Sequence, residues 1–188
     1  AVFAKKHFEK ATMLDPDYKM GLLGSLMLEC GISESLDERS LTELQRRFRE
    51  ALILQEDPSI LSSLVEMSGA GLSCLKRSEM DRLFDAFTSN PRVGPDKKMK
   101  MHSLHANYLW LTERDLVAAQ GALRKSLDIA PGNRSVLLKW AELDYISGDL
   151  EGARKLLKEL ESEPFSPVER NTLESLLAEI DATKGKSP

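Results

Sequence analysis

Apolar residues recur along this chain at the spacing of an α-helix. Between successive glycines and prolines, hydrophobic side chains fall at positions i, i+3, i+4 and i+7, which places them on one helical face. No segment alternates apolar and polar residues strictly, so the sequence predicts an all-α chain without strands. The expected helices cover residues 2–14, 19–29, 36–54, 58–69, 79–90, 95–111, 115–129, 134–147, 150–161 and 167–182.

Several of these helices begin at recognisable capping residues. Ser35 and Glu38 form a capping box, in which each side chain can bond the other residue's backbone N–H, and Ser166 and Glu169 repeat this arrangement. Ser78 is expected to cap the helix that follows it. Because the connections are short, neighbouring helices should run antiparallel, and the helical hairpin is the expected structural unit.

One residue pattern occurs three times. A small residue, a large residue four positions later and a third residue three positions after that precede a proline. The pattern stands at Ala119, Leu123, Ser126 and Pro131, again at Ala153, Leu157, Leu160 and Pro164, and at Ala4, Phe8, Ala11 and Pro16. The small residue lets two helices approach, the large one fills the space between them, and the proline ends the helix.

This pattern resembles the second helix of a tetratricopeptide repeat, a helical hairpin whose length of about 34 residues matches the spacing from Ala119 to Ala153. The resemblance implies two such repeats over 100–133 and 134–167, and the second helix of a truncated repeat over 1–18, with an upstream helix outside this sequence. Residues 19–99, whose period is irregular, are expected to form helical hairpins continuous with the array. Residues 168–188 should supply a capping helix and a frayed tail. The implied fold is a right-handed α-solenoid of antiparallel helical hairpins.

The first of the two full repeats departs from the family pattern at two positions. Asn107 stands where the first helix of the repeat carries a small residue, and Arg114 stands where the turn carries glycine. The second repeat has Ala141 and Gly148 at these positions, although its proline comes one residue early.

The middle of the chain carries a second, narrower resemblance. An apolar helix ends at Cys30, helices with the sequences LTELQRRF and ILSSLV follow, and Cys74 precedes an acidic helix that ends in Asn-Pro-Arg at 90–92. This order resembles the C-terminal domain of the O-antigen polymerase and ligase superfamily of membrane proteins, which includes protein O-oligosaccharyltransferases. The resemblance implies a periplasmic tail, at a bacterial inner membrane, of an enzyme that transfers a lipid-linked glycan. The catalytic residues of that family lie elsewhere, so none is expected here.

The two cysteines leave two alternatives open. The periplasmic setting implied by this resemblance would permit a disulfide between Cys30 and Cys74, because that compartment is oxidising. Alternatively, both are buried thiols that pack as small hydrophobic groups.

Composition and charge narrow the function classes. The chain is 41% hydrophobic and 30% charged, which is too apolar for a disordered chain and too charged for a membrane-embedded one. The longest nearly apolar run, 21–28, is far shorter than the ~20 residues that a spanning helix needs. The 26 basic and 30 acidic residues are mixed along the chain, so there is no basic stripe for nucleic acid.

Few residues suggest chemistry. His102 and His105 lie one turn apart on one helical face, a spacing that metal sites use, but the local sequence supplies no further ligands. Glycine-rich phosphate loops and nucleophile elbows are missing from the sequence. We therefore expect no catalytic residue, metal or cofactor in this segment.

The repeat register instead predicts a binding surface on the concave face of the array. The expected lining residues are Met101, Leu104, His105, Tyr108, Leu138, Glu142 and Tyr145. Apolar and aromatic groups with one acid suit a partly apolar peptide or a stacked sugar, although any of them could instead pack on the next helix. The lysine and asparagine clamp of co-chaperone repeats is not expected, because these positions hold other residues.

The sequence thus predicts a non-catalytic domain that binds a protein or peptide partner on its concave face. In the preferred interpretation it is the periplasmic tail of a membrane glycan-transfer enzyme. The alternative is a tetratricopeptide adaptor or co-chaperone scaffold unrelated to glycans, in the cytoplasm.

Overall fold

The chain is all-α over the part that the computed structural model describes, which is Lys10, Leu14, Arg46 and residues 59–70 and 75–184. The two continuous ranges form seven helices and no strand, as predicted. The helices are α4 (Ser59–Gly69), α5 (Arg77–Ser89), α6 (Pro95–Leu111), α7 (Leu116–Ile129), α8 (Arg134–Ser147), α9 (Leu150–Leu160) and α10 (Pro167–Lys184). None of the described helices is both long enough and apolar enough to cross a bilayer. Most of the elements predicted before residue 59, and both Cys30 and Cys74, lie outside the described residues.

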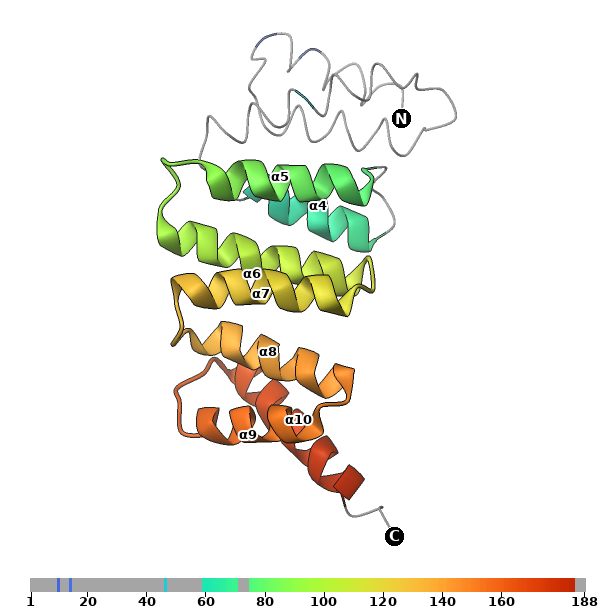
Figure 1. Ribbon diagram of the computed structural model, residues 1–188, viewed down its shortest axis with the longest axis vertical. Coiled ribbons are helices and arrows are strands. Elements are labelled where there is room, and N and C mark those ends of the chain that lie inside the picture. The colour runs from blue at the N-terminus through green and yellow to red at the C-terminus, as the bar shows by residue number, and fades with distance from the viewer. Residues whose placement is uncertain (1–9, 11–13, 15–45, 47–58, 71–74, 185–188) are drawn as a thin grey trace.

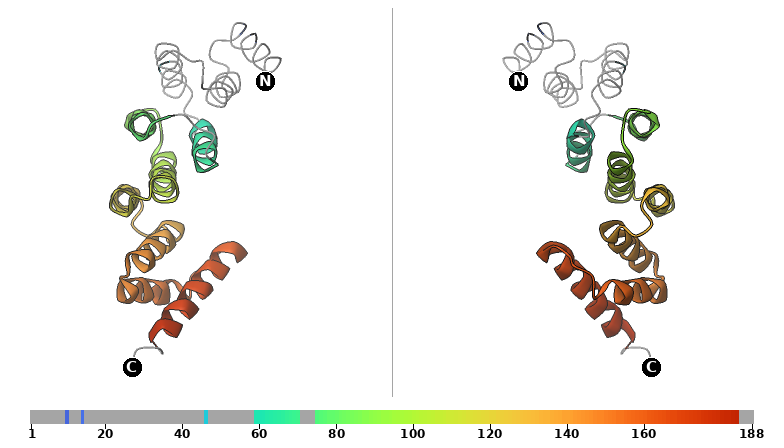
Figure 2. Two further views of the ribbon diagram at one scale, coloured as in Figure 1. Left: turned by 90° about the vertical axis from the view of Figure 1, so that its right-hand side faces the viewer. Right: turned by 90° about the vertical axis from the view of Figure 1, so that its left-hand side faces the viewer.

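The described helices are stacked from α4 and α5 at one end to α9 and α10 at the other (Figure 1). α6 packs against α7, and α8 against α9, as hairpins joined by short turns. Seen from the side, α4, α6 and α8 succeed one another along one side of the stack, and α5 and α7 along the other (Figure 2). The described helices thus include two helical hairpins, α6–α7 and α8–α9.

Residues that are 34 positions apart in the sequence are buried alike in α7 and α9. Ala119 and Ala153, which occupy equivalent positions in α7 and α9, are both 0% exposed, and so are Leu123 and Leu157. The small residue of each pair lies where two helices meet, and the leucine fills the adjoining space. The α6–α7 and α8–α9 hairpins thus bury equivalent positions.

The N-terminal caps of α7 and α9 are also equivalent. Asp115 caps α7 by accepting a hydrogen bond from the backbone N–H of Ala118 at 2.9 Å. Asp149 caps α9 by accepting one from Gly152 N–H, also at 2.9 Å. Each carboxylate satisfies a donor that the first helical turn leaves unpaired, and it complements the positive end of the helix dipole.

The turns that precede these caps share a left-handed backbone. Gly148 has φ of 89°, and Arg114, at the equivalent position of the preceding hairpin, has φ of 56°. A side chain in this region costs roughly 1–2 kcal/mol, which explains why the repeat pattern favours glycine there. The guanidinium of Arg114 lies 5.5 Å from the centroid of the Trp110 ring, a favourable contact that offsets part of this cost.

Two predicted boundaries differ from the structure. Ser78 does not cap α5, because Glu79 and Met80 already donate their backbone N–H groups to Lys76 O at 2.9 and 3.1 Å, so the helix begins at Arg77. α6 begins at Pro95, as its start signal predicted, and therefore lies partly before the expected repeat boundary at 100.

The described interior consists of two apolar clusters that meet at α8. The first extends from α4 through α7 to Val136 and Leu143 of α8, and the second joins Leu138 and Ala141 of α8 to α9 and α10. Ser126 is the buried polar exception in α7, and its hydroxyl donates to Met99 O at 2.8 Å, which ties α7 to α6.

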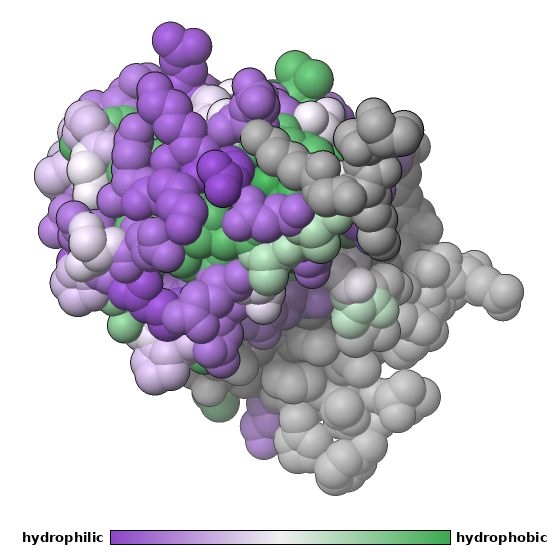
Figure 3. All heavy atoms as spheres, turned by 90° about the horizontal axis from the view of Figure 1, so that it is seen from below, coloured by the Kyte–Doolittle hydropathy of each residue, from purple (hydrophilic) through white to green (hydrophobic). Residues whose placement is uncertain are grey.

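α10 ends the stack. It runs obliquely and packs against both α8 and α9 (Figure 2). Its start confirms the predicted capping box, because the Glu169 carboxylate accepts from Ser166 N–H at 3.1 Å and Ser166 Oγ accepts from Glu169 N–H at 3.3 Å. Viewed from this end, the surface is mostly hydrophilic around a smaller apolar area (Figure 3). The helix therefore covers the apolar face that an open stack would leave exposed.

Candidate functional site

Two hollows lie between α6 and α8, the first helices of the two hairpins, and we call them together the α6–α8 groove. The larger has a volume of about 390 Å3, and the smaller one about 240 Å3. Asn107 of α6 and Lys139 of α8 line both of them, so the hollows meet at this pair. Side chains of the larger hollow are Ser62, Met99, Lys100, Met101, Ser103, Leu104, Asn107, Asn133, Ser135, Val136 and Lys139.

Lys139 is the central polar side chain of the groove. Its Nζ donates to Asn107 Oδ1 at 3.2 Å, and among the described residues no ion pair joins it to a carboxylate. Burial lowers the pKa of Lys139, although the negative charges of Glu142 and Glu169 oppose this shift. A lysine ammonium has three donors, so the bond to Asn107 leaves hydrogen-bonding capacity directed at the groove.

The smaller hollow is mainly apolar. Leu111 and Ile146 at its rim are 58% and 42% exposed, and Trp110 lines it beside them. Glu142 is its acid, and burial raises the pKa of this carboxyl. A partner could therefore place an apolar side chain here, next to a carboxyl that can accept a hydrogen bond.

The structure does not gather the seven predicted groove residues into one surface. Leu104 and Glu142 line the groove, and Met101, only 3% exposed, forms part of its floor. Tyr108 and Leu138 are 1% and 3% exposed and line neither hollow. Their placement on an open face is a wrong prediction, because α6 and α8 are covered on several sides and these two side chains fill the interior.

The other two predicted residues take part in contacts between helices. The Tyr145 hydroxyl donates to Glu179 Oε2 of α10 at 2.7 Å, so this side chain holds the last helix. His105 turns toward α5, where its Nε2 lies 2.8 Å from Asp81 Oδ1. Neither side chain lines the α6–α8 groove.

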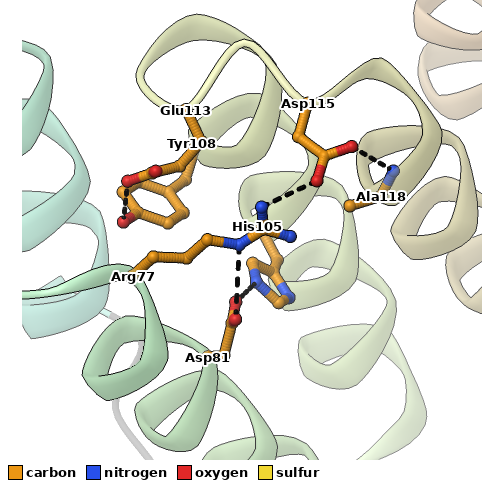
Figure 4. A network of polar contacts seen from close by, with 7 residues as sticks. All are labelled: Arg77, Asp81, His105, Tyr108, Glu113, Asp115 and Ala118. Atoms are coloured by element: carbon orange, nitrogen blue, oxygen red, sulfur yellow. Dashed lines mark hydrogen bonds and ion pairs between the residues drawn. The ribbon is translucent and has the colours of Figure 1, made fainter.

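His105 belongs to a polar network that joins α5, α6 and the start of α7 (Figure 4). Arg77 pairs with Asp115 at 2.7 Å and with Asp81 at 3.6 Å. The Asp115 carboxylate that receives this guanidinium also caps α7, and both contacts hold the pKa of Asp115 below its usual value. The network therefore fixes the start of α7 against α5.

The imidazole of His105 is well covered in this network. Its ring stacks on Phe84 with centroids 4.2 Å apart, and its side chain is 13% exposed. Burial lowers the pKa of His105, and the hydrogen bond to Asp81 opposes this shift. Over the part of the chain that the structure describes, no cluster of three or more metal-ligating side chains forms around His102 and His105. These contacts make His105 a packed, hydrogen-bonded side chain between α5 and α6.

Lys139 was not among the residues predicted from the sequence. Asn107 stood out only as a departure from the small residue of the repeat pattern. That departure was the available signal, because a half-buried amide needs a hydrogen-bond partner on the facing helix, and Lys139 is two residues before the equivalent position at Ala141.

Comparison with known proteins adds no relative. The chain matches no model of a protein family, and no curated protein matches it. A function for this chain therefore has to be inferred from the repeat pattern of its sequence and from the groove between α6 and α8.

Proposed function

We propose that this chain is a non-catalytic interaction module of tetratricopeptide-like hairpins, which binds an extended peptide segment of a partner protein in the α6–α8 groove. The observation that carries the proposal is the pair of adjoining hollows between the first helices of two successive hairpins that bury equivalent positions. Stacked repeats create extended binding surfaces along equivalent helices of successive units.

Peptide selection tests this proposal. We expect a phage-displayed library of random peptides to yield binders on the purified protein. Ile146→Arg, which places a charge at the rim of the smaller hollow, should weaken these binders about tenfold or more, because a buried apolar contact is lost. Val117→Arg is the matched control, because Val117 is 80% exposed on α7 and lines neither hollow. A library without binders, or binders that both variants retain equally, would contradict the proposal.

We further propose that the module is the periplasmic tail of a membrane enzyme of the O-antigen polymerase and ligase type. The support is the order of features around Cys30, Cys74 and the Asn-Pro-Arg sequence at 90–92. The alternative, an adaptor or co-chaperone scaffold unrelated to glycans, uses the same groove in a reducing compartment.

Whether Cys30 and Cys74 form a disulfide distinguishes the periplasmic tail from the adaptor. The folded protein is equilibrated in a glutathione buffer at an oxidising potential and is then unfolded in an alkylating agent without reductant. Mass spectrometry of the intact protein counts the alkylated cysteines. Two unmodified cysteines in a monomer indicate a native disulfide between Cys30 and Cys74, as a periplasmic domain permits. Two alkylated cysteines favour the adaptor.

A further inference from the structure

We infer that the α6–α8 groove recognises a peptide with an acidic side chain next to an apolar one, and that Lys139 anchors the acidic group in the larger hollow. This inference rests on the proposed function and adds the chemistry of the partner. The apolar side chain enters the smaller hollow, beside Trp110, Leu111 and Ile146.

The charge of the larger hollow is the first argument. Among the described residues, its lining contains two lysines, Lys100 and Lys139, and no aspartate or glutamate. Lys100 is exposed at the rim, whereas Lys139 lies deeper, where Asn107 accepts its one hydrogen bond at 3.2 Å. A partly desolvated ammonium gains more from a carboxylate than an exposed one does, because fewer water molecules compete with the ion pair.

The nearby acids Glu142 and Glu169 act on this ammonium through their charges, but among the described residues neither forms an ion pair with it. Glu169 is directed to other donors, since its carboxylate accepts from the hydroxyls of Ser135 at 2.5 Å and Ser166 at 2.7 Å. Glu142 lines the smaller hollow, and among the described residues it forms no ion pair with Lys139. The charge in the larger hollow is thus available to a ligand.

The two hollows also set the order of the peptide's side chains. In the smaller hollow Glu142 lies beside Lys139 and makes this hollow a less favourable place for a second carboxylate, whereas Trp110, Leu111 and Ile146 offer apolar surface there. The acidic side chain is therefore directed to the larger hollow and the apolar one to the smaller hollow. Since Asn107 and Lys139 line both hollows, one short extended segment can reach both.

The experiment uses the peptides selected from the random library on the full chain. Each is synthesised with a fluorescent label, once as selected and once with its aspartate or glutamate replaced by asparagine or glutamine. Affinities are measured by fluorescence anisotropy on the wild type, Lys139→Gln and Lys139→Arg. Lys139→Gln keeps a donor for Asn107 and removes the charge, whereas Lys139→Arg keeps the charge. Lys125→Gln, at an exposed lysine on α7, is the matched control.

We expect acidic residues to be enriched among the selected peptides. Replacing Lys139 by glutamine and replacing the peptide's acid by its amide should each weaken binding about tenfold. Both changes together should weaken binding no further, because each of them removes the same ion pair. Lys139→Arg should retain most of the affinity, and Lys125→Gln all of it.

Selected peptides without acidic residues, or acidic peptides that bind Lys139→Gln as tightly as the wild type, would overturn the inference. If those peptides still lose affinity with Ile146→Arg, the proposed function stands while the acidic anchor fails. If Lys139→Gln does not fold, by circular dichroism, the comparison of carboxylate and amide peptides on the wild type decides the question alone.

Discussion

His105 of α6 is a closely packed side chain that contacts α5. Its ring stacks on Phe84, and its Nε2 is bonded to Asp81. Burial lowers the pKa of His105 below its usual value of 6.5, so the folded state favours the neutral imidazole. In the unfolded chain the same group takes up a proton near the ordinary value.

This difference predicts a loss of stability in mild acid. Because the folded pKa of His105 is depressed, the unfolded state binds more protons below about pH 6.5, and the free energy of unfolding should fall as pH decreases through this range. Urea unfolding at about pH 7.5 and about pH 5.5 measures the change. His105→Gln should show a smaller difference between the two pH values than the wild type. An equal difference in both proteins would assign the effect to other groups, such as His102, whose pKa is also lowered by burial.

At the scale of the element, the two aspartate caps show how local sequence starts a helix. Asp115 and Asp149 occupy equivalent positions and make the same bond to the backbone three residues on. They differ in their surroundings, because Asp115 also receives the Arg77 guanidinium at 2.7 Å. The cap of α7 is therefore linked to α5, whereas the cap of α9 is local.

This contrast predicts unequal costs for removing the caps. Asp149→Ala should lower the free energy of unfolding by about 1 kcal/mol, the usual cost of an N-cap. Asp115→Ala should lower the free energy of unfolding by more than Asp149→Ala does, because the contact with Arg77 is lost as well. Chemical unfolding measures both. Asp128→Ala, at an exposed aspartate near the end of α7, should leave stability unchanged or slightly higher, because a negative charge there opposes the helix dipole.

At the scale of the whole molecule, the described interior is divided into two clusters that share α8. The second depends on α10, whose Leu173 and Ile180 are 0% exposed against α8 and α9. Each unit of a stack contacts mainly its neighbours, so damage at one end should remain partly local.

We predict this locality for a cavity in the second cluster. Leu173→Ala should destabilise the protein by about 3 kcal/mol, because it removes buried methyl groups from a packed site. Amide hydrogen exchange should accelerate in α9 and α10 much more than in α6 and α7. Val168→Ala is the control, since Val168 is 75% exposed. Uniform acceleration over all the described helices would show instead that the stack unfolds as one unit.

The helices and their ends were largely predictable from the sequence. α6 begins at Pro95 and α8 spans Arg134–Ser147 as expected, because helical periodicity, N-caps and proline act within a few residues. Ser78 shows the limit of such signals, since backbone bonds to Lys76 start the helix before this serine and leave no mark in the side-chain pattern.

The groove was less predictable. Of the residues that the repeat register placed on an open face, Leu104 and Glu142 line the groove, whereas Tyr108 and Leu138 are buried. A register states which side chains share a helical face. It does not state how much of that face the neighbouring helices cover.

The all-α class and the capping box of α10 could be predicted from the sequence alone, because they follow from bonds and spacings within one helix. The meeting of polar groups from different helices could not be predicted in this way. Asn107 and Lys139 are 32 residues apart and join two hollows, whereas His105 turns away from the groove toward Asp81. Such pairings depend on the relative placement of whole helices, which arises from the packing of the entire core.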